Sequence, residues 1–179
     1  MKKLNIIIIL ISGLVIFGCN SSKKDKQLTE QEKMAYNIAS MEEDLFDDIE
    51  PDKDKAMNMI DSYLEYVEKF PEDTLSPEYL FKASEIAMNF EQPHNSVRYL
   101  QQIENNYPEY EKYPTCIFMI GHVYDYYIGD LAKAKKYYTK YIDNYPDHTF
   151  VKDAKGALTF MGMTDDQLID LFEDINKYN

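Results

Sequence analysis

The fold of this chain is decided by residues 113–146, YPTCIFMIGHVYDYYIGDLAKAKKYYTKYIDNYP. Apolar residues recur every three or four positions on both sides of Gly129-Asp130, which predicts two helices joined by a turn. The stretch closes in Tyr145-Pro146, and similar aromatic-proline pairs stand at Tyr107-Pro108 and Phe70-Pro71, 38 and then 37 residues earlier. A period of this size predicts helical hairpins that stack on copies of themselves.

Helix-capping signals extend this pattern over the rest of the chain. Thr29-Glu32 and Thr164-Gln167 have the spacing of capping boxes, and Ser76-Pro77 has that of an N-cap followed by proline at the first helical position. We also expect helices to begin at Pro51-Asp52, Pro93, Pro114 and Asp130, and an unpaired first helix of a fourth unit over residues 150–160. The chain is therefore predicted to be all-α.

The residues of the best copy carry a resemblance to a known family. They are a small residue and a Tyr in the first helix, a Gly-Asp turn, an Ala and an aromatic in the second helix, and a closing Pro: Gly121, Tyr124, Gly129-Asp130, Ala134, Tyr138 and Pro146. The stretch resembles the tetratricopeptide repeat. A weaker middle copy keeps Ala83, Ile86, Leu100 and Pro108 but has Ser96 in place of the Ala, and the resemblance covers roughly residues 30–162.

The resemblance implies a short right-handed α-solenoid of about three tetratricopeptide-type hairpins. The hairpins are expected over about residues 30–71, 76–108 and 113–146, with capping helices over 150–178. Long, Tyr-rich repeats that close in Tyr-Pro also look like those of periplasmic tetratricopeptide lipoproteins of the BamD type. We take this second likeness as one of architecture.

The N-terminal residues predict export and a lipid anchor. Lys2 and Lys3 precede an apolar run over residues 6–17 that is too short for a permanent membrane span and has the pattern of a secretory signal. The run ends at Gly18-Cys19, which resembles a bacterial lipobox with Cys19 as the lipidated residue. We expect a signal peptide at 1–18, a lipidated Cys and flexible tether at 19–28, and the repeat domain at 29–179. The alternative is an N-terminal membrane anchor with an incidental cysteine.

Charge and cysteine content limit what the chain can do. The chain has 32 acidic and 19 basic residues and a formal charge of −13, so nucleic acid is not an expected partner. Besides Cys19 there is only Cys116, which we expect to be a buried structural thiol.

We find no pattern of an enzyme. Three histidines lie scattered at positions 94, 122 and 148, and the sequence has neither a His-Glu-x-x-His motif nor a glycine-rich phosphate loop. His122 and Asp125 share one helix face, but two ligands do not make a metal site. No catalytic residue, metal or cofactor is predicted.

Tetratricopeptide repeats usually bind partners on a concave face lined by the first helix of each hairpin. The resemblance places a partner-binding groove at six positions: Leu80, Ser84, Thr115, Phe118, His122 and Asp125. Leu80 and Phe118 fit a core position equally well. Among the tyrosines, we expect Tyr126, Tyr127 and Tyr137 to be exposed and most of the others to pack between helices.

These features together predict a lipid-anchored adaptor of the cell envelope that binds protein or peptide partners and touches the membrane through Cys19. We expect it at the outer membrane, with the periplasmic face favoured over the cell surface. By resemblance, one concrete role is outer-membrane protein assembly or envelope maintenance. The alternative is a glycan- or nutrient-binding surface lipoprotein, which the absence of tryptophan disfavours.

Overall fold

The computed structural model describes residues 27–46 and 52–177. The predicted signal peptide, Cys19 and most of the predicted tether lie outside the described residues. Within them the chain forms α1 (Glu30–Phe46), α2 (Lys53–Lys69), α3 (Leu75–Asn89), α4 (Pro93–Asn106), α5 (Tyr113–Val123), the π-helical segment η1 (Tyr124–Ile128), α6 (Leu131–Asn144), α7 (Val151–Phe160) and α8 (Asp165–Lys177). The described part of the chain has no strand, and the prediction of an all-α fold is confirmed.

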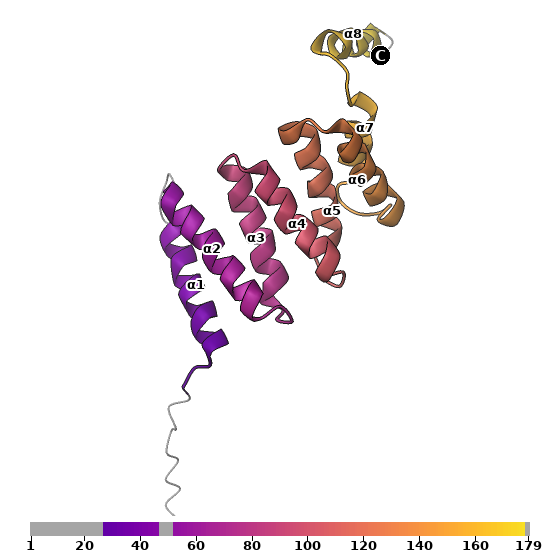
Figure 1. The fold of residues 1–179 in the computed structure, drawn as a ribbon. Helices are drawn as coiled ribbons and strands as arrows, with labels where there is room; N and C mark the ends of the chain where they lie inside the picture. Colours follow the sequence, from indigo (N-terminus) through magenta and orange to yellow (C-terminus); the bar gives the residue numbers. More distant parts are fainter. Residues whose placement is uncertain (1–26, 47–51, 178–179) are drawn as a thin grey trace, which may run out of the picture.

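The helices form a row of stacked antiparallel hairpins (Figure 1). From α1 to α7, each helix packs chiefly against its neighbours in chain order. The hairpins α1–α2, α3–α4 and α5–α6 match the three predicted repeats, and α7 takes the place of the first helix of a fourth. The predicted solenoid of stacked helical hairpins is confirmed.

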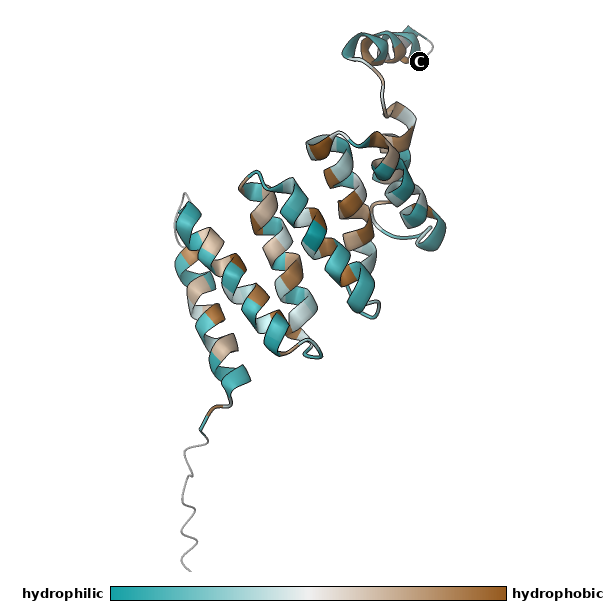
Figure 2. Ribbon diagram, in the orientation of Figure 1, coloured by the Kyte–Doolittle hydropathy of each residue, from teal (hydrophilic) through white to brown (hydrophobic). Residues whose placement is uncertain are grey.

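Buried tyrosines form much of the core between the hairpins. Figure 2 shows further apolar residues, in brown, along α2 to α5. Tyr63 stacks on Tyr79 with ring centroids 5.0 Å apart, and Tyr66 meets the edge of Tyr79 at 4.8 Å. The side chain of Tyr66 is fully buried. These large rings fill space at the contact between α2 and α3.

Tyr137 differs from the prediction that it is exposed, since only 8% of it is accessible to solvent. Its side chain lies against α4, where its hydroxyl donates a hydrogen bond to Oε2 of Glu104 at 3.0 Å. A tyrosine can be buried at a polar edge of this kind because its hydroxyl finds a partner there. Tyr126 and Tyr127 are 70% and 55% exposed, as predicted.

The three aromatic-proline connectors share the same backbone conformation. Phe70, Tyr107 and Tyr145 end their helices with φ of −130°, −132° and −134°, and each N–H donates to the carbonyl four residues earlier at 2.9 Å. The carbonyl of each aromatic residue then accepts a bond from the N–H three residues later. Proline cannot continue the helix, and the residue before it avoids the helical region, so the pairs stop each helix at the same place.

Most predicted helix starts are observed. Thr29 and Glu32 exchange both bonds of a capping box, at 2.8 and 3.1 Å, and Thr164 and Gln167 do so at 2.9 and 3.3 Å. The prediction that Ser76 caps α3 is wrong. The helix begins at Leu75, and the Ser76 hydroxyl donates instead to the carbonyl of Phe70 at 2.6 Å.

Two turns between helices have an irregular backbone conformation. In the α3–α4 turn, Glu91 adopts φ of 57°, an uncommon conformation for a residue with a side chain. In the third hairpin, the last turn of the first helix widens into the π-helical segment η1, and Gly129 follows with φ of 77°. A single π turn accommodates an inserted residue without breaking the helix.

Ion pairs connect successive hairpins. Lys82 pairs with Glu42 at 2.8 Å, Lys112 with Glu78 at 2.9 Å, and Lys140 with Glu104 at 2.6 Å. All of these groups are partly exposed, so each pair contributes at most about 1 kcal/mol. Their main effect is to neutralise the carboxylates that lie between neighbouring hairpins.

The C-terminal helix α8 stands beyond α7, at the end of the row in Figure 1. Ile169 and Ile175 on this helix are 55% and 46% exposed. Across residues 27–46 and 52–177, no helix combines the length and the apolar character that crossing a bilayer requires.

Candidate partner-binding site

A hollow of about 740 Å³ opens between α5, η1, α7 and the first turn of α8. Aromatic and methionine side chains dominate its walls. They come from three parts of the chain, namely Phe118, His122, Tyr126 and Tyr138 from the third hairpin, Phe150 and Phe160 from the ends of α7, and Met161 and Met163 from the loop before α8. We call this surface the α5–α7 hollow.

Stacked rings form the floor of the α5–α7 hollow. Phe118 stacks on Phe150 with centroids 4.8 Å apart and contacts Tyr141 at 5.5 Å and Tyr138 at 5.7 Å. His122 lies one helical turn further along α5 and stacks against Phe118 at 6.2 Å. The floor is therefore fixed by packing before any partner arrives.

The π-helical turn places aromatic side chains at the mouth of the hollow. After Val123 the backbone widens, and Tyr126 and Tyr127 are exposed to solvent instead of packing between helices. The ring of Tyr126 approaches His122 with centroids 4.7 Å apart, and that of Tyr127 meets His122 at 5.9 Å. π-helical turns inside α-helices are frequent at functional sites.

A few charged groups lie at the edge of the hollow: Asp125, Lys152 and Asp153. Oδ2 of Asp125 accepts a hydrogen bond from the Tyr138 hydroxyl at 3.4 Å. Burial lowers the pKa of His122 below its ordinary value of 6.5, and Asp125 opposes this shift. The imidazole is therefore mostly neutral at pH 7, like the aromatic rings beside it.

The structure brings together three of the six predicted groove residues. Phe118, His122 and Asp125 line the α5–α7 hollow, whereas Thr115 is half-buried and does not line it. Whether these residues bind a partner stays a prediction.

The placement of Leu80 and Ser84 in a groove is wrong. Both side chains are completely buried, and the Ser84 hydroxyl donates to the carbonyl of Phe81 at 2.6 Å. The face of α3 that carries them packs against its neighbouring helices, so no partner can reach them.

Sequence reasoning missed the contribution of α7 and the loop after it. Phe150, Phe160, Met161 and Met163 line the α5–α7 hollow, yet they belong to no complete repeat. The signal that was available is the expected first helix of a fourth unit, since that helix must lie beside the first helix of the third hairpin.

The described residues show no arrangement for metal chemistry. Across residues 27–46 and 52–177, no group of three or more His, Cys, Asp or Glu side chains is placed to hold a metal ion. Cys116 is fully buried, and burial raises the pKa of its thiol to about 12. The thiol is therefore a poor nucleophile at neutral pH.

Comparison with known proteins identifies the third hairpin. Residues 116–148 match the family model of the tetratricopeptide repeat. The match runs from α5 to the connector after α6 and so includes η1. A search of curated proteins finds none that matches the chain. Tetratricopeptide repeats are generally scaffolds that bind other proteins and have no enzymatic activity of their own.

Proposed function

We propose that this tetratricopeptide repeat protein is an adaptor that holds a partner protein by its apolar side chains in the α5–α7 hollow. The observation that carries the proposal is the exposure of Tyr126 and Tyr127 beside a hollow lined by packed aromatic rings. Exposed aromatic side chains grouped at a hollow are typical of protein interfaces.

The chemistry of the hollow supports a protein ligand. Tyrosine offers a large contact area at a low cost in conformational entropy, and its hydroxyl can bond a partner's backbone. The two methionines, Met161 and Met163, have flexible thioether side chains that adapt to irregular surfaces. Because the side chains around Phe118 are already packed, binding there costs little conformational entropy.

We further propose that the adaptor is lipidated at Cys19 and works in the cell envelope, in outer-membrane protein assembly or envelope maintenance. The residue pattern before Cys19 and the architecture of the repeats support this proposal. Mass spectrometry of the full chain from a membrane fraction should find an acylated Cys19, and Cys19→Ser should move the protein to the soluble fraction. An unmodified Cys19 in a membrane-bound protein would contradict the lipid anchor.

The adaptor function is tested by purifying the tagged protein from detergent-solubilised envelopes and identifying stoichiometric partners. Tyr126→Ala should abolish their recovery, because it removes the exposed ring at the mouth of the hollow. Tyr36→Ala is the matched control, since Tyr36 lies on α1 and is also 70% exposed. Each partner is then purified and titrated against both variants to measure the dissociation constant directly.

Equal recovery of partners by the two variants would contradict the role of the α5–α7 hollow. Saturable glycan binding, measured by calorimetry and lost in Tyr126→Ala, would instead favour the alternative function of a glycan-binding lipoprotein. An aromatic hollow can stack sugars as well as side chains, so this measurement distinguishes the two functions.

A further inference from the structure

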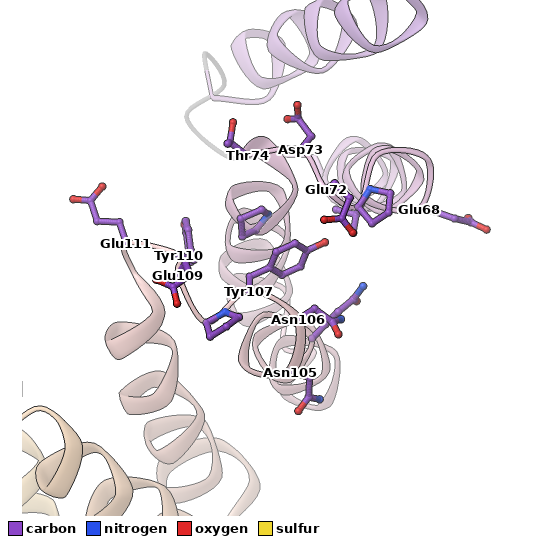
Figure 3. A pocket seen from close by; sticks show the side chains of 15 residues that line it. Glu68, Glu72, Asp73, Thr74, Asn105, Asn106, Tyr107, Glu109, Tyr110 and Glu111 are labelled. Carbon is purple, nitrogen blue, oxygen red and sulfur yellow. The ribbon is translucent and has the colours of Figure 1, made fainter.

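A second and larger cleft lies where the first two aromatic-proline connectors come close together. The connector between α2 and α3 faces the connector between α4 and α5 across a space of about 970 Å³ (Figure 3). Residues 67–77 form one wall, and residues 102–111 form the other. We call it the connector cleft. It shares no lining residue with the α5–α7 hollow.

Apolar groups form the walls of the connector cleft, and one aromatic ring stands between them. Pro71 and Pro77 line one side and Pro108 the other, and the ring of Tyr107 points into the space between the two connectors in Figure 3. Burial raises the pKa of the Tyr107 hydroxyl, and the negative charge of Glu72 raises it further. Glu72 therefore places a negative charge near this ring.

The charged side chains that line the connector cleft are all acidic: Glu68, Glu72, Asp73, Glu109 and Glu111. Asp73 is engaged within the protein, where its Oδ1 accepts bonds from the Tyr66 hydroxyl at 3.1 Å and the Leu75 N–H at 2.8 Å. The four glutamates are exposed at the rim, and none has an ion pair among the described residues.

The unpaired state of these glutamates contrasts with the rest of the solenoid. Glu42, Glu78 and Glu104, which lie between hairpins, each have a lysine within 2.9 Å. The lysines near the cleft are already engaged, because Lys69 pairs with Glu30 and Glu65 and Lys112 pairs with Glu78. Within residues 27–46 and 52–177, no lysine or arginine side chain lines the connector cleft.

The backbone adds to the negative potential. Helices α2 and α4 end at Lys69 and Asn106, beside the cleft, and the last carbonyls of a helix carry a partial negative charge. Gln102, Asn105 and Asn106 also line the cleft with amides that can donate to and accept from a peptide backbone. Two helix C-termini and four carboxylates without an ion pair therefore favour a positively charged ligand.

We propose that the connector cleft binds a basic, extended segment of a partner protein. A lysine or arginine side chain of the segment lies against the face of Tyr107, between Glu72 and Glu109, while its backbone bonds the amides of Gln102 and Asn105. A cation above an aromatic ring gains from the negative face of the ring as well as from the carboxylates. The volume exceeds that of one side chain, which favours a peptide over a small cation.

The test uses an eight-residue lysine peptide, acetylated at its N-terminus, amidated at its C-terminus and fluorescently labelled, with anisotropy read at about 0.15 M salt. The cleft variant carries E68Q, E72Q, E109Q and E111Q. The control variant, E43Q, D61N, D143N and D170N, loses the same charge at exposed residues outside the cleft. We expect the cleft variant to weaken binding at least about tenfold and the control variant less than about twofold.

Two further measurements make the result specific to this surface. Tyr107→Leu keeps an apolar side chain but removes the ring, and it should weaken binding severalfold while circular dichroism shows an unchanged helix content. Tyr126→Ala should bind the peptide like the wild type, because Tyr126 lies outside the connector cleft. The peptide therefore tests the connector cleft alone, and the recovery of partners from envelopes tests the α5–α7 hollow. Equal weakening by the cleft and control variants, or undiminished binding by the cleft variant, would overturn the proposal.

Discussion

The hydroxyl of Ser96 is buried in the core face of α4 and has no hydrogen-bond partner in the part of the chain that the structure describes. This serine occupies the position where the repeat pattern has alanine. Ser96→Ala removes an unsatisfied polar group at little loss of volume, so we expect the free energy of unfolding in urea to rise by about 1 kcal/mol. Ser84→Ala is the control: Ser84 is equally buried, but its hydroxyl is bonded to Phe81. A loss of stability in Ser96→Ala would mean that its hydroxyl is satisfied in solution.

His122 gives the α5–α7 hollow a dependence on pH. Its pKa is lowered in the folded protein by burial, against the attraction of Asp125. The unfolded chain therefore binds a proton at a higher pH than the folded one, and stability that is fully present above about pH 6.5 is lost as the pH falls below that value. Lys152 and Asp153 from α7 also line the hollow. Both residues are left unchanged in the variants, so that the variant and the wild type differ only at the imidazole.

The measurement is the urea midpoint of the wild type and of His122→Gln between pH 7.5 and about 5. We expect His122→Gln to lose less stability on acidification than the wild type. His94→Gln, at an exposed histidine on α4, should follow the wild type. The same slope in His122→Gln and wild type would contradict the assignment of the shift to this imidazole.

At the scale of the helices, α5 and α6 approach each other closely at Gly121. A Cβ built there would lie 3.0 Å from Cδ1 of Tyr138 and 3.3 Å from Cβ of Tyr137, both in buried residues that cannot move aside. Alanine is favoured over glycine within a helix by up to about 1 kcal/mol, but overpacking costs about 1–3 kcal/mol. Gly121→Ala should therefore lower the free energy of unfolding, as measured by urea denaturation.

Gly156 in the middle of α7 provides the matched control. A Cβ at this position meets no atom within 4 Å, so only the helix preference acts and Gly156→Ala should stabilise the protein. A stabilising effect of Gly121→Ala, similar to that of Gly156→Ala, would show that the contact between α5 and α6 is looser than described.

The ends of the helices could largely be predicted from the sequence because their causes are local. The capping boxes at Thr29 and Thr164 and the proline connectors involve residues within a few positions of one another. The left-handed turn at Glu91 and the π-helical turn η1 have no comparable local signal in the sequence.

The candidate site could be predicted only in part for the same reason. Leu80 and Ser84 are buried while Phe118 and His122 line a hollow, and this difference depends on which neighbouring helices pack against α3 and α5. The connector cleft is made by two connectors that lie about one repeat apart in the sequence, and only the stacking of the hairpins brings them together. The spacing of apolar residues along the sequence does not show which distant segments the fold brings together.

At the scale of the whole molecule, the solenoid separates two surfaces of different chemistry. The α5–α7 hollow belongs to the C-terminal elements and is aromatic, whereas the connector cleft lies between the first two connectors and is acidic. Under the two proposals, the α5–α7 hollow takes apolar side chains of a partner and the connector cleft takes a basic segment. A partner that engaged both would gain affinity without a new contact at either surface.

The most direct test of the account is hydrogen–deuterium exchange on the purified protein alone and in complex with a partner that it retains from envelopes. We expect the partner to slow exchange in residues 118–128 and 150–163, which contain η1, α7 and the loop before α8. Protection confined to α1 and α2, with no change in those two segments, would contradict the claim that the α5–α7 hollow holds the partner.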